Sequence, residues 1–264
     1  MEIFKEKCEE VFPRARLVRG SRDYFRVRKG DYVIEIIPTL QIEKPEEAEN
    51  TMDLSIFHIA YVKNVFSKKP WLKDEVKLFK AFLQAINCYG AETYKHGFSG
   101  YASELLVINF GSFLNTLKQL SQLKPKIFVD PGKHYRNFEE AKACLSEAKL
   151  KSPIILIDPT FKERNALASL NYETFSRFVF EARRFLLKPS SNFFKRQKIT
   201  KSLLLRRSRE RGTKLYTLKL KKPLHNEEIF LAKLEKELRR FKARVEREGF
   251  KVYEIGFHEV DDGV

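Results

Sequence analysis

The spacing of apolar residues changes along the chain, and these changes constrain the fold more than any other feature. Residues 2–11 have helical spacing, whereas residues 14–37 contain RARLV, YFRVR and DYVIEII, three short segments rich in β-branched and aromatic residues. From residue 53 to residue 187 the spacing is helical again. Residues 213–260 have the pattern of a strand, a helix and a strand. The sequence therefore predicts an α+β chain.

The middle of the chain is predicted to be a helical domain with little sheet. Residues 99–122 are its most apolar segment and are expected to be one helix buried between its neighbours. Asp53 or Ser55 can cap the first helix. SPIILIDP, residues 152–159, is expected to be a short apolar strand. The predicted helices cover residues 53–66, 73–87, 99–122, 136–150 and 172–187.

The two ends of the chain are predicted to be β-rich. YFRVR and DYVIEII are expected to pair as a hairpin, and DYVIEIIPTL, residues 31–40, has the pattern of a buried strand that carries a single carboxylate, Glu35. Near the other end, strands over 213–223 and 250–260 are expected to flank a helix over 227–248, with Asn226 as its N-cap and Gly249 at its end. Two strands and one helix cannot bury both faces of a sheet, so this unit is predicted to be incomplete. The predicted domains are 1–50, 51–188 and 189–264.

Composition and charge restrict the possible functions. No apolar run approaches the length of a membrane span, so no membrane partner is expected. The three cysteines, Cys8, Cys88 and Cys144, are widely spaced, which argues against a disulfide framework or zinc cluster and favours the reducing cytoplasm. Residues 183–222 contain fifteen Lys and Arg and one acid, Glu210, and so carry +14 of the net charge of +16.

So one-sided a block of charge indicates a polyanionic partner. RNA, DNA and a membrane surface are the candidates, and nucleic acid is favoured. The alternative is a lysine-rich solvated surface, but such surfaces also gain Glu, which is nearly absent from this block. The predicted RNA-binding residues are Arg183, Arg184, Lys195, Arg196, Lys198, Arg206, Arg207, Arg209 and Arg211.

Polar residues at the boundaries of the predicted elements are the remaining candidates for chemistry, because the common catalytic and phosphate-binding motifs are absent from the sequence. Each has an ordinary structural interpretation. His58 alone fits a satisfied helix histidine, Lys80 a lysine that extends to solvent, and Tyr89 an aromatic residue at the edge of the core. Ser99, in the turn GFSG before a helix, fits a helix cap, although a helix N-terminus also binds phosphate.

Four segments taken together are more specific: LKDEVKLFKAFLQAINCYGAE, HGFSGYASELLVINFGSFLNTL, IDPTFKERNALASL and FSRFVFEARRFLLKPSSNFFK. They resemble the archaeal-type (class I) CCA-adding enzymes, tRNA nucleotidyltransferases that build and repair the CCA end of tRNA. The resemblance extends over residues 1–258 and implies a head domain of the polymerase-β type, in which three carboxylates bind two Mg²⁺ ions.

The resemblance also implies roles for individual residues. EIIPTLQI matches the strand that carries the third carboxylate, so Glu35 would be the catalytic and metal-binding residue. His58, Lys80 and Tyr89 match positions that hold the triphosphate of ATP or CTP. Arg164 matches an arginine that recognises the incoming base together with the tRNA backbone. Ser99 joins these residues as part of the phosphate-binding helix start.

The chain departs from the family pattern at both ends. Residues 1–13 lack the GS turn and the DxD pair that carry the other two carboxylates, and Gly20-Ser21-Arg22-Asp23 lies between the wrong strands to replace them. Position 35 has Glu in place of Asp, and the second half of the body domain and the tail are missing. The sequence therefore predicts one subunit of a split enzyme, with a second polypeptide that supplies the GS and DxD strands and possibly a third that supplies the tail. A non-catalytic protein that binds the tRNA acceptor end and a truncated gene product are the alternatives.

Overall fold

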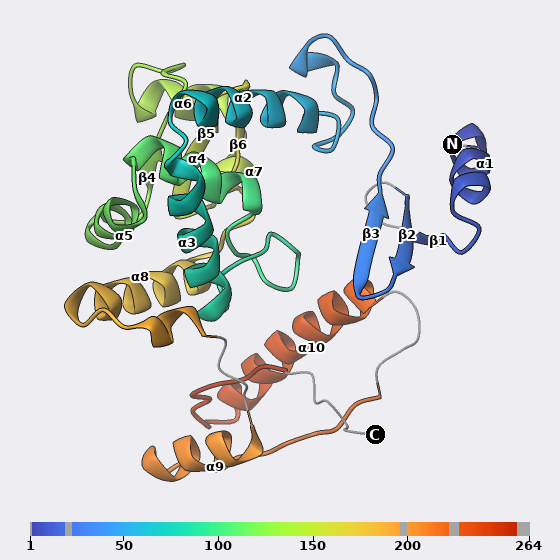
Figure 1. Cartoon of the computed structure of the whole chain (residues 1–264). Helices are drawn as coiled ribbons and strands as arrows, with labels where there is room; N and C mark the ends of the chain where they lie inside the picture. The colour runs from blue at the N-terminus through green and yellow to red at the C-terminus, as the bar shows by residue number, and fades with distance from the viewer. Residues whose placement is uncertain (1, 19–22, 196–199, 222–226, 258–264) are drawn as a thin grey trace.

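The computed structural model describes the chain except for residues 1, 19–22, 196–199, 222–226 and 258–264. Figure 1 shows a small antiparallel sheet near the N-terminus, a central domain of helices around a second sheet, and two further helices beyond α8 (Tyr172–Leu187). The α+β class predicted from the sequence is confirmed. The three domain boundaries stay predictions. In the described part of the chain, every helix is too short or too polar to cross a membrane.

The N-terminal sheet has the order β1-β2-β3. Helix α1 (Glu2–Val11) precedes β1 (Arg16–Val18), β2 (Tyr24–Lys29) and β3 (Tyr32–Ile36). The predicted hairpin is confirmed, because β2 and β3 are antiparallel neighbours with Arg26 opposite Glu35. Phe25 of β2 is buried and contacts Phe4 of α1 in an edge-to-face arrangement.

The prediction that residues 31–40 form a buried strand is wrong. The side chains of Tyr32 and Val33 are 77% and 57% exposed, and Glu35 is exposed as well. An apolar run has the same appearance in a central strand and in a strand that pairs on one side only, so the sequence could not separate the two cases. The buried apolar residues of this sheet lie on β2 instead.

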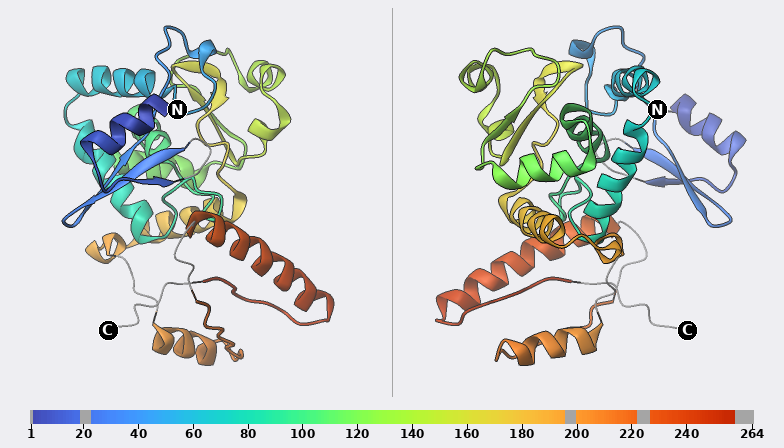
Figure 2. Two further views of the ribbon diagram at one scale, coloured as in Figure 1. Left: turned by 90° about the vertical axis from the view of Figure 1, so that its right-hand side faces the viewer. Right: turned by 60° about the vertical axis from the view of Figure 1, so that its left-hand side comes forward.

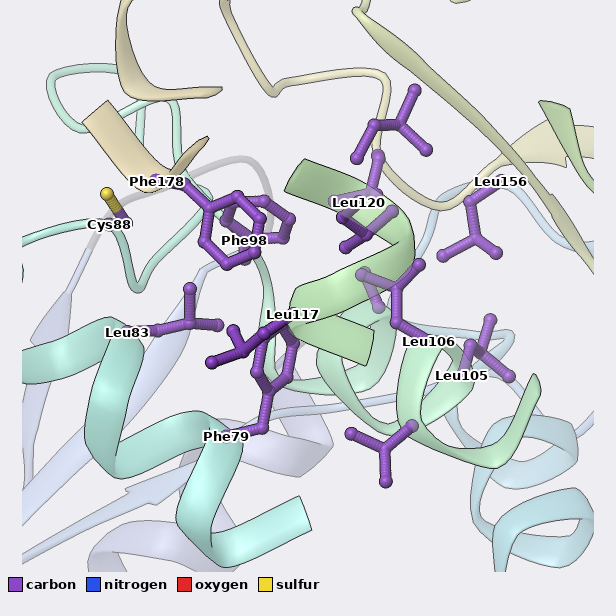
Figure 3. Close-up of a cluster of buried hydrophobic side chains, with 14 of the residues drawn as sticks. Phe79, Leu83, Cys88, Phe98, Leu105, Leu106, Leu117, Leu120, Leu156 and Phe178 are labelled. Carbon is purple, nitrogen blue, oxygen red and sulfur yellow. The ribbon is translucent and has the colours of Figure 1, made fainter. Parts of the chain in front are cut away.

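The central domain is built around one core of apolar side chains. Its helices are α2 (Ser55–Lys68), α3 (Leu72–Ala85), α4 (Gly100–Phe110), α5 (Phe113–Gln122) and α8. Phe79 and Phe82 of α3 contact Phe178 of α8 edge to face, and all three side chains are buried. Figure 3 shows leucines of α4 and α5 in the same cluster. The core therefore holds α4 between α3 and α5, as its apolar sequence predicts.

Two details of the predicted helices are wrong. Residues 99–122 form α4 and α5 rather than one helix, because Gly111 has a left-handed φ of +82° and Ser112 caps α5 by accepting a hydrogen bond from the N–H of Asn115. Helix α2 begins at Ser55 without a side-chain cap. The carboxylate of Asp53 instead accepts hydrogen bonds from the N–H groups of Leu40 and Asn50, and so ties the preceding loop to the helix.

A second sheet, of order β4-β5-β6, lies against the helices. Strand β5 (Ile154–Asp158) was predicted, but β4 (Ile127–Val129) and β6 (Phe161–Asn165) were not, since β4 is very short and β6 is largely polar. Strand β4 is parallel to β5, and β6 is antiparallel to it. Ile154 and Leu156 face the main core, while Ile155 and Ile157 face a small cluster that includes helix α6. The predicted helix 136–150 is two helices, α6 (Phe138–Cys144) and α7 (Glu147–Leu150).

The part of the chain after α8 differs from the predicted β-α-β unit. It contains η2 (Ser191–Phe194), α9 (Lys201–Glu210) and α10 (Glu227–Arg247), and Figures 1 and 2 show α9 and α10 beyond α8 on the side away from α2. Gly249 follows α10 with a φ of +86°, as expected for a residue that ends a helix. Asn226 lies outside the described residues.

Neither predicted strand is present in the described residues 213–221 and 250–257. Tyr216 and Leu218 are 84% and 83% exposed. The alternating side chains of residues 213–221 therefore pack against no apolar surface among the described residues. Helix α9, within the basic block, was missed because its many arginines hide a weak apolar spacing.

The turn between α3 and α4 sets the position of Tyr89. Tyr89 and Phe98 form an isolated β-bridge, and the N–H groups of Gly97 and Phe98 donate to the carbonyls of Gly90 and Cys88. Gly97 allows this crossing, because a Cβ atom there would lie 2.3 Å from the carbonyl oxygen of Cys88. The absence of a side chain at Gly97 therefore keeps the two ends of the turn together.

The substitution Gly97→Ala is expected to reduce the free energy of unfolding by about 3 kcal/mol, because backbone must move to accept the new methyl group. Gly111→Ala is the matched control. Its Cβ would meet no atom within 4 Å, so only the cost of the left-handed φ remains, about 1 kcal/mol. Urea unfolding followed by circular dichroism measures both. Equal losses in the two variants would contradict the role given to Gly97.

Candidate functional site

The first turn of helix α4 is where the predicted nucleotide-binding residues converge. They come from separate elements: His58 from α2, Lys80 from α3, Tyr89 from the turn after α3, Ser99 from the N-cap of α4 and Arg164 from β6. Gly100 and Tyr101, the first two residues of α4, each contact part of this set. The structure thus brings together side chains that are up to 106 residues apart in sequence.

The first part of the site surrounds Gly100. A Cβ atom at Gly100 would lie 2.9 Å from the hydroxyl oxygen of Tyr89 and 3.9 Å from Nζ of Lys80, so both polar groups point at the start of α4. Ser99 caps this helix, since its Oγ accepts a hydrogen bond from the N–H of Ala102. Free N–H groups and the helix dipole favour an anion at such a position. An ammonium group, a phenol and a helix start together form a suitable phosphate site.

Lys80 is not a lysine that simply extends to solvent. Its Nζ lies 2.6 Å from Oε1 of Glu104 on α4, and the two side chains are 26% and 23% exposed. The ion pair fixes the direction of the Lys80 side chain along α4. Glu104 was not a candidate in the sequence, although it is the only acid in the apolar segment GYASELLVINF.

The second part of the site surrounds Asp158, the last residue of β5. Its side chain is 0% exposed, and its Oδ2 lies 2.9 Å from Nε2 of His58 and 2.8 Å from a guanidinium nitrogen of Arg164. Its Oδ1 accepts hydrogen bonds from the hydroxyl of Tyr101 and from the backbone N–H and hydroxyl of Thr160. One buried carboxylate therefore joins α2, α4, β5 and β6.

The aromatic ring of Tyr101 completes this cluster. The ring of His58 stacks on it, with centroids 3.9 Å apart and an interplanar angle of 19°, and the guanidinium of Arg164 lies 5.9 Å from its centroid. Tyr101 and Asp158 could not be selected from the sequence, because a tyrosine after a glycine and an aspartate before a proline are both common in turns.

The charges of this cluster are set by its contacts. Burial alone would raise the pKa of Asp158, but His58, the N–H of Thr160 and Arg164 outweigh burial and hold that pKa below its usual range. Burial, followed by the charge of Asp158, raises the pKa of Tyr101. Asp158 is therefore an ionised acceptor and Tyr101 a protonated donor at neutral pH.

Glu35 lies elsewhere, on β3 of the N-terminal sheet. Its Oε1 accepts hydrogen bonds from Nε and a terminal nitrogen of Arg26, at 3.0 and 2.6 Å, and both side chains are 41% exposed. Within the described ranges of the chain, no group of three or more His, Cys, Asp or Glu side chains is placed to hold a metal ion. A single carboxylate paired with arginine does not fit the predicted Mg²⁺ site. Glu35 can bind Mg²⁺ only when other carboxylates join it.

The predicted RNA-binding residues have several environments. Arg183 donates to the carbonyl of Ser121 and so links α8 to the end of α5. Arg184 pairs with Glu181 and lies over the rings of Phe180 and Phe193. Arg207 and Arg211 face Glu254, and Arg206 faces Glu210. Arg209 is exposed on α9, as is Lys195 after η2. Arg196 and Lys198 lie outside the described residues.

The chain is similar in sequence to proteins of one known family. The family described as "tRNA nucleotidyltransferase, second domain" matches residues 74–195. The CCA-adding enzyme of Nanoarchaeum equitans is 44% identical over 162 residues, which are 61% of this chain and 41% of that protein. The CCA-adding enzyme of Pyrococcus abyssi is 38% identical over 235 residues, 88% of this chain and 51% of that protein. The chain belongs to the archaeal-type CCA-adding enzyme family.

The matched family domain runs from α3 through η2 and contains both parts of the site except His58. Glu35 also lies before it. A further relative, the CCA-adding enzyme of Sulfurisphaera tokodaii, is 29% identical over 96% of this chain and 58% of its own length. The chain thus spans about half the length of the relatives it matches.

The pKa of Asp158 predicts a pH dependence of stability. A carboxyl group whose pKa is lower in the folded state stabilises the fold above its unfolded pKa, about 4, and this contribution is lost as the pH falls through the folded value. We expect Asp158→Asn to reduce the free energy of unfolding by about 3 kcal/mol at pH 7, since it leaves buried partners of a charge pair behind.

The difference in melting temperature between the unchanged chain and Asp158→Asn should be constant from pH 7 to pH 5 and shrink below pH 4. Glu139→Gln is the control, because the side chain of Glu139 is exposed on α6, and it should give little difference at any of these pH values. Calorimetric scans across this range measure the effect. A difference that is the same at pH 3 and pH 7 would contradict it.

Proposed function

We propose that this chain provides the nucleotide-binding site of a CCA-adding tRNA nucleotidyltransferase, which adds CMP and AMP to the 3′ end of tRNA. The observation that carries the proposal is the convergence of Lys80, Tyr89 and Ser99 on the first turn of α4, beside the cluster of His58 and Arg164. Membership of the CCA-adding enzyme family supports the same reaction.

The substrates would be ATP and CTP. Lys80 supplies a point charge, Tyr89 a hydroxyl donor and α4 its N-terminal N–H groups, and together these suit the oxygens of a triphosphate. Because Gly100 has no side chain, the hydroxyl of Tyr89 can lie against the start of α4. Arg164, whose guanidinium offers several donors in one plane, would contact the base and the tRNA backbone.

Completion of the catalytic site requires carboxylates besides Glu35. A second polypeptide with the GS and DxD strands would supply them, and a tail that grips the tRNA could be carried by a third. Glu35 would then be released from Arg26 to act with the added carboxylates, which would hold the Mg²⁺ expected with ATP and CTP. The open side of β3, exposed in this structure, offers backbone groups to which another strand can pair.

The acceptor end of tRNA is the proposed macromolecular partner. Exposed Arg209 and Lys195 are suited to phosphate contacts, whereas Arg183 is occupied in joining α8 to α5. The net charge of residues 183–222 supports binding of a polyanion. The reaction itself would take place in the cytoplasm.

Substitution Lys80→Met tests the nucleotide site. We expect the affinity of the chain for ATP to fall about tenfold, because a charge-assisted contact to phosphate is lost while the length of the side chain is kept. Lys77→Met is the control on the same helix, since Lys77 is exposed and pairs with Asp74 one turn away. Isothermal titration with ATP measures both. If the two variants bind ATP equally well, Lys80 is not part of the site.

Glu35→Ala tests the catalytic assignment. The chain is mixed with the second polypeptide, tRNA that lacks CCA, radiolabelled CTP or ATP, and Mg²⁺. We expect Glu35→Ala to abolish incorporation and to leave tRNA binding unchanged, because it removes a carboxylate of the reaction site but no cation that faces RNA. Glu46→Ala, an exposed acid beyond β3, is the control and should retain incorporation. Incorporation by the Glu35→Ala mixture would contradict the assignment, and no incorporation by the unchanged mixture would contradict the proposed reaction.

A further inference from the structure

Asp158 is the most buried charged group of the site, and no role is assigned to it by the sequence or by the proposed reaction. Its carboxylate has two sets of partners. Oδ1 is held by Tyr101 and Thr160, which orient the carboxylate. Oδ2 faces His58 and Arg164, which are both candidates for contact with the nucleotide. One oxygen therefore orients the carboxylate, and the other contacts the candidate nucleotide ligands.

We propose that Asp158 is a positioning residue that holds His58 and Arg164 in the arrangement that receives the nucleotide. This inference rests on the proposed function, because His58 and Arg164 are nucleotide ligands only under that proposal. Asp158 itself does not contact substrate, since its side chain is 0% exposed beneath His58 and Arg164.

The effect on His58 follows from the charge of Asp158. Nε2 of His58 lies 2.9 Å from Oδ2, although it is not aligned for a regular hydrogen bond. An ionised carboxylate at this distance favours the tautomer with its proton on Nε2, which leaves Nδ1 as the ring atom available to a ligand. The ring cannot turn freely, because it stacks on Tyr101 at a centroid distance of 3.9 Å. Asp158 and Tyr101 thus determine both the tautomer and the orientation of His58.

The effect on Arg164 is similar. One terminal nitrogen of Arg164 donates to Oδ2 at 2.8 Å, and the guanidinium lies 5.9 Å from the centroid of Tyr101. The planar group has other N–H donors in fixed directions once one of them is held. Because the side chain of Arg164 is only 20% exposed, few other orientations are open to it.

The contacts of Asp158 go beyond those needed to hold the end of β5. Thr160 and Tyr101 already satisfy Oδ1. Oδ2 instead meets side chains of α2 and β6 that are both candidate nucleotide ligands, one hundred residues before Asp158 and six residues after it. Oδ2 therefore brings the His58 ring and the Arg164 guanidinium to one acceptor atom, at 2.9 and 2.8 Å. Asp158 lets these two side chains share one small site.

Asp158→Asn and Thr160→Val test the proposal in the full chain. Asp158→Asn removes the charge and is expected to weaken ATP binding about tenfold or more. Thr160→Val removes only the hydroxyl donor to Oδ1 and keeps the backbone N–H, so we expect ATP affinity within about twofold of the unchanged chain. Titration calorimetry is done below the melting temperature of each variant. Equal ATP affinity in Asp158→Asn and the unchanged chain would overturn the positioning role.

A second measurement needs no variant and does not depend on activity. Long-range ¹H–¹⁵N spectra of the chain with ¹⁵N-labelled histidine report which ring nitrogen of His58 is protonated. The expected result is a protonated Nε2, and an unprotonated Nε2 at pH 7 would overturn the inference even if Asp158→Asn fails to fold. Failure of the unchanged chain to bind ATP would instead overturn the proposed function, while a protonated Nε2 would still support the contact between Asp158 and His58.

Discussion

The site depends on the burial of helix α4. Because its apolar side chains pack against α3 and α5, the N-terminus of α4 is held at a fixed place in the core. The turn at Gly97 then brings Tyr89 to that N-terminus, and the ion pair with Glu104 brings Lys80. Hydrophobic packing therefore sets the position of polar groups that could not otherwise be held near one another.

Asp158 holds the polar side chains near the first turn of α4, as apolar packing holds the helix itself. Burial of an isolated carboxylate is unfavourable, and the partners of Asp158 offset that penalty by supplying the Arg164 guanidinium, the His58 ring and three hydrogen-bond donors. Each partner lies on a different loop, helix or strand. The carboxylate thus links the small sheet to the helices at the point where both border the site.

The N-terminal sheet and the central domain carry different groups of candidate residues. The five candidate ligands for the nucleotide meet around one helix start, whereas Glu35 is paired with Arg26 on an exposed strand. Under the proposed function, the nucleotide site would therefore lie within the central domain, and transfer would need further groups that join Glu35.

The sequence by itself determined the α+β class, the order of most helices and the family, because these depend on local spacing and on long matching segments. Residue matching also selected Lys80, Tyr89 and Arg164. Tertiary structure alone decided that residues 31–40 are exposed, that residues 213–221 are not a strand, and that Gly111 divides one apolar segment into two helices. It alone placed Asp158 against His58, since contacts between residues one hundred positions apart arise from packing and leave no local pattern.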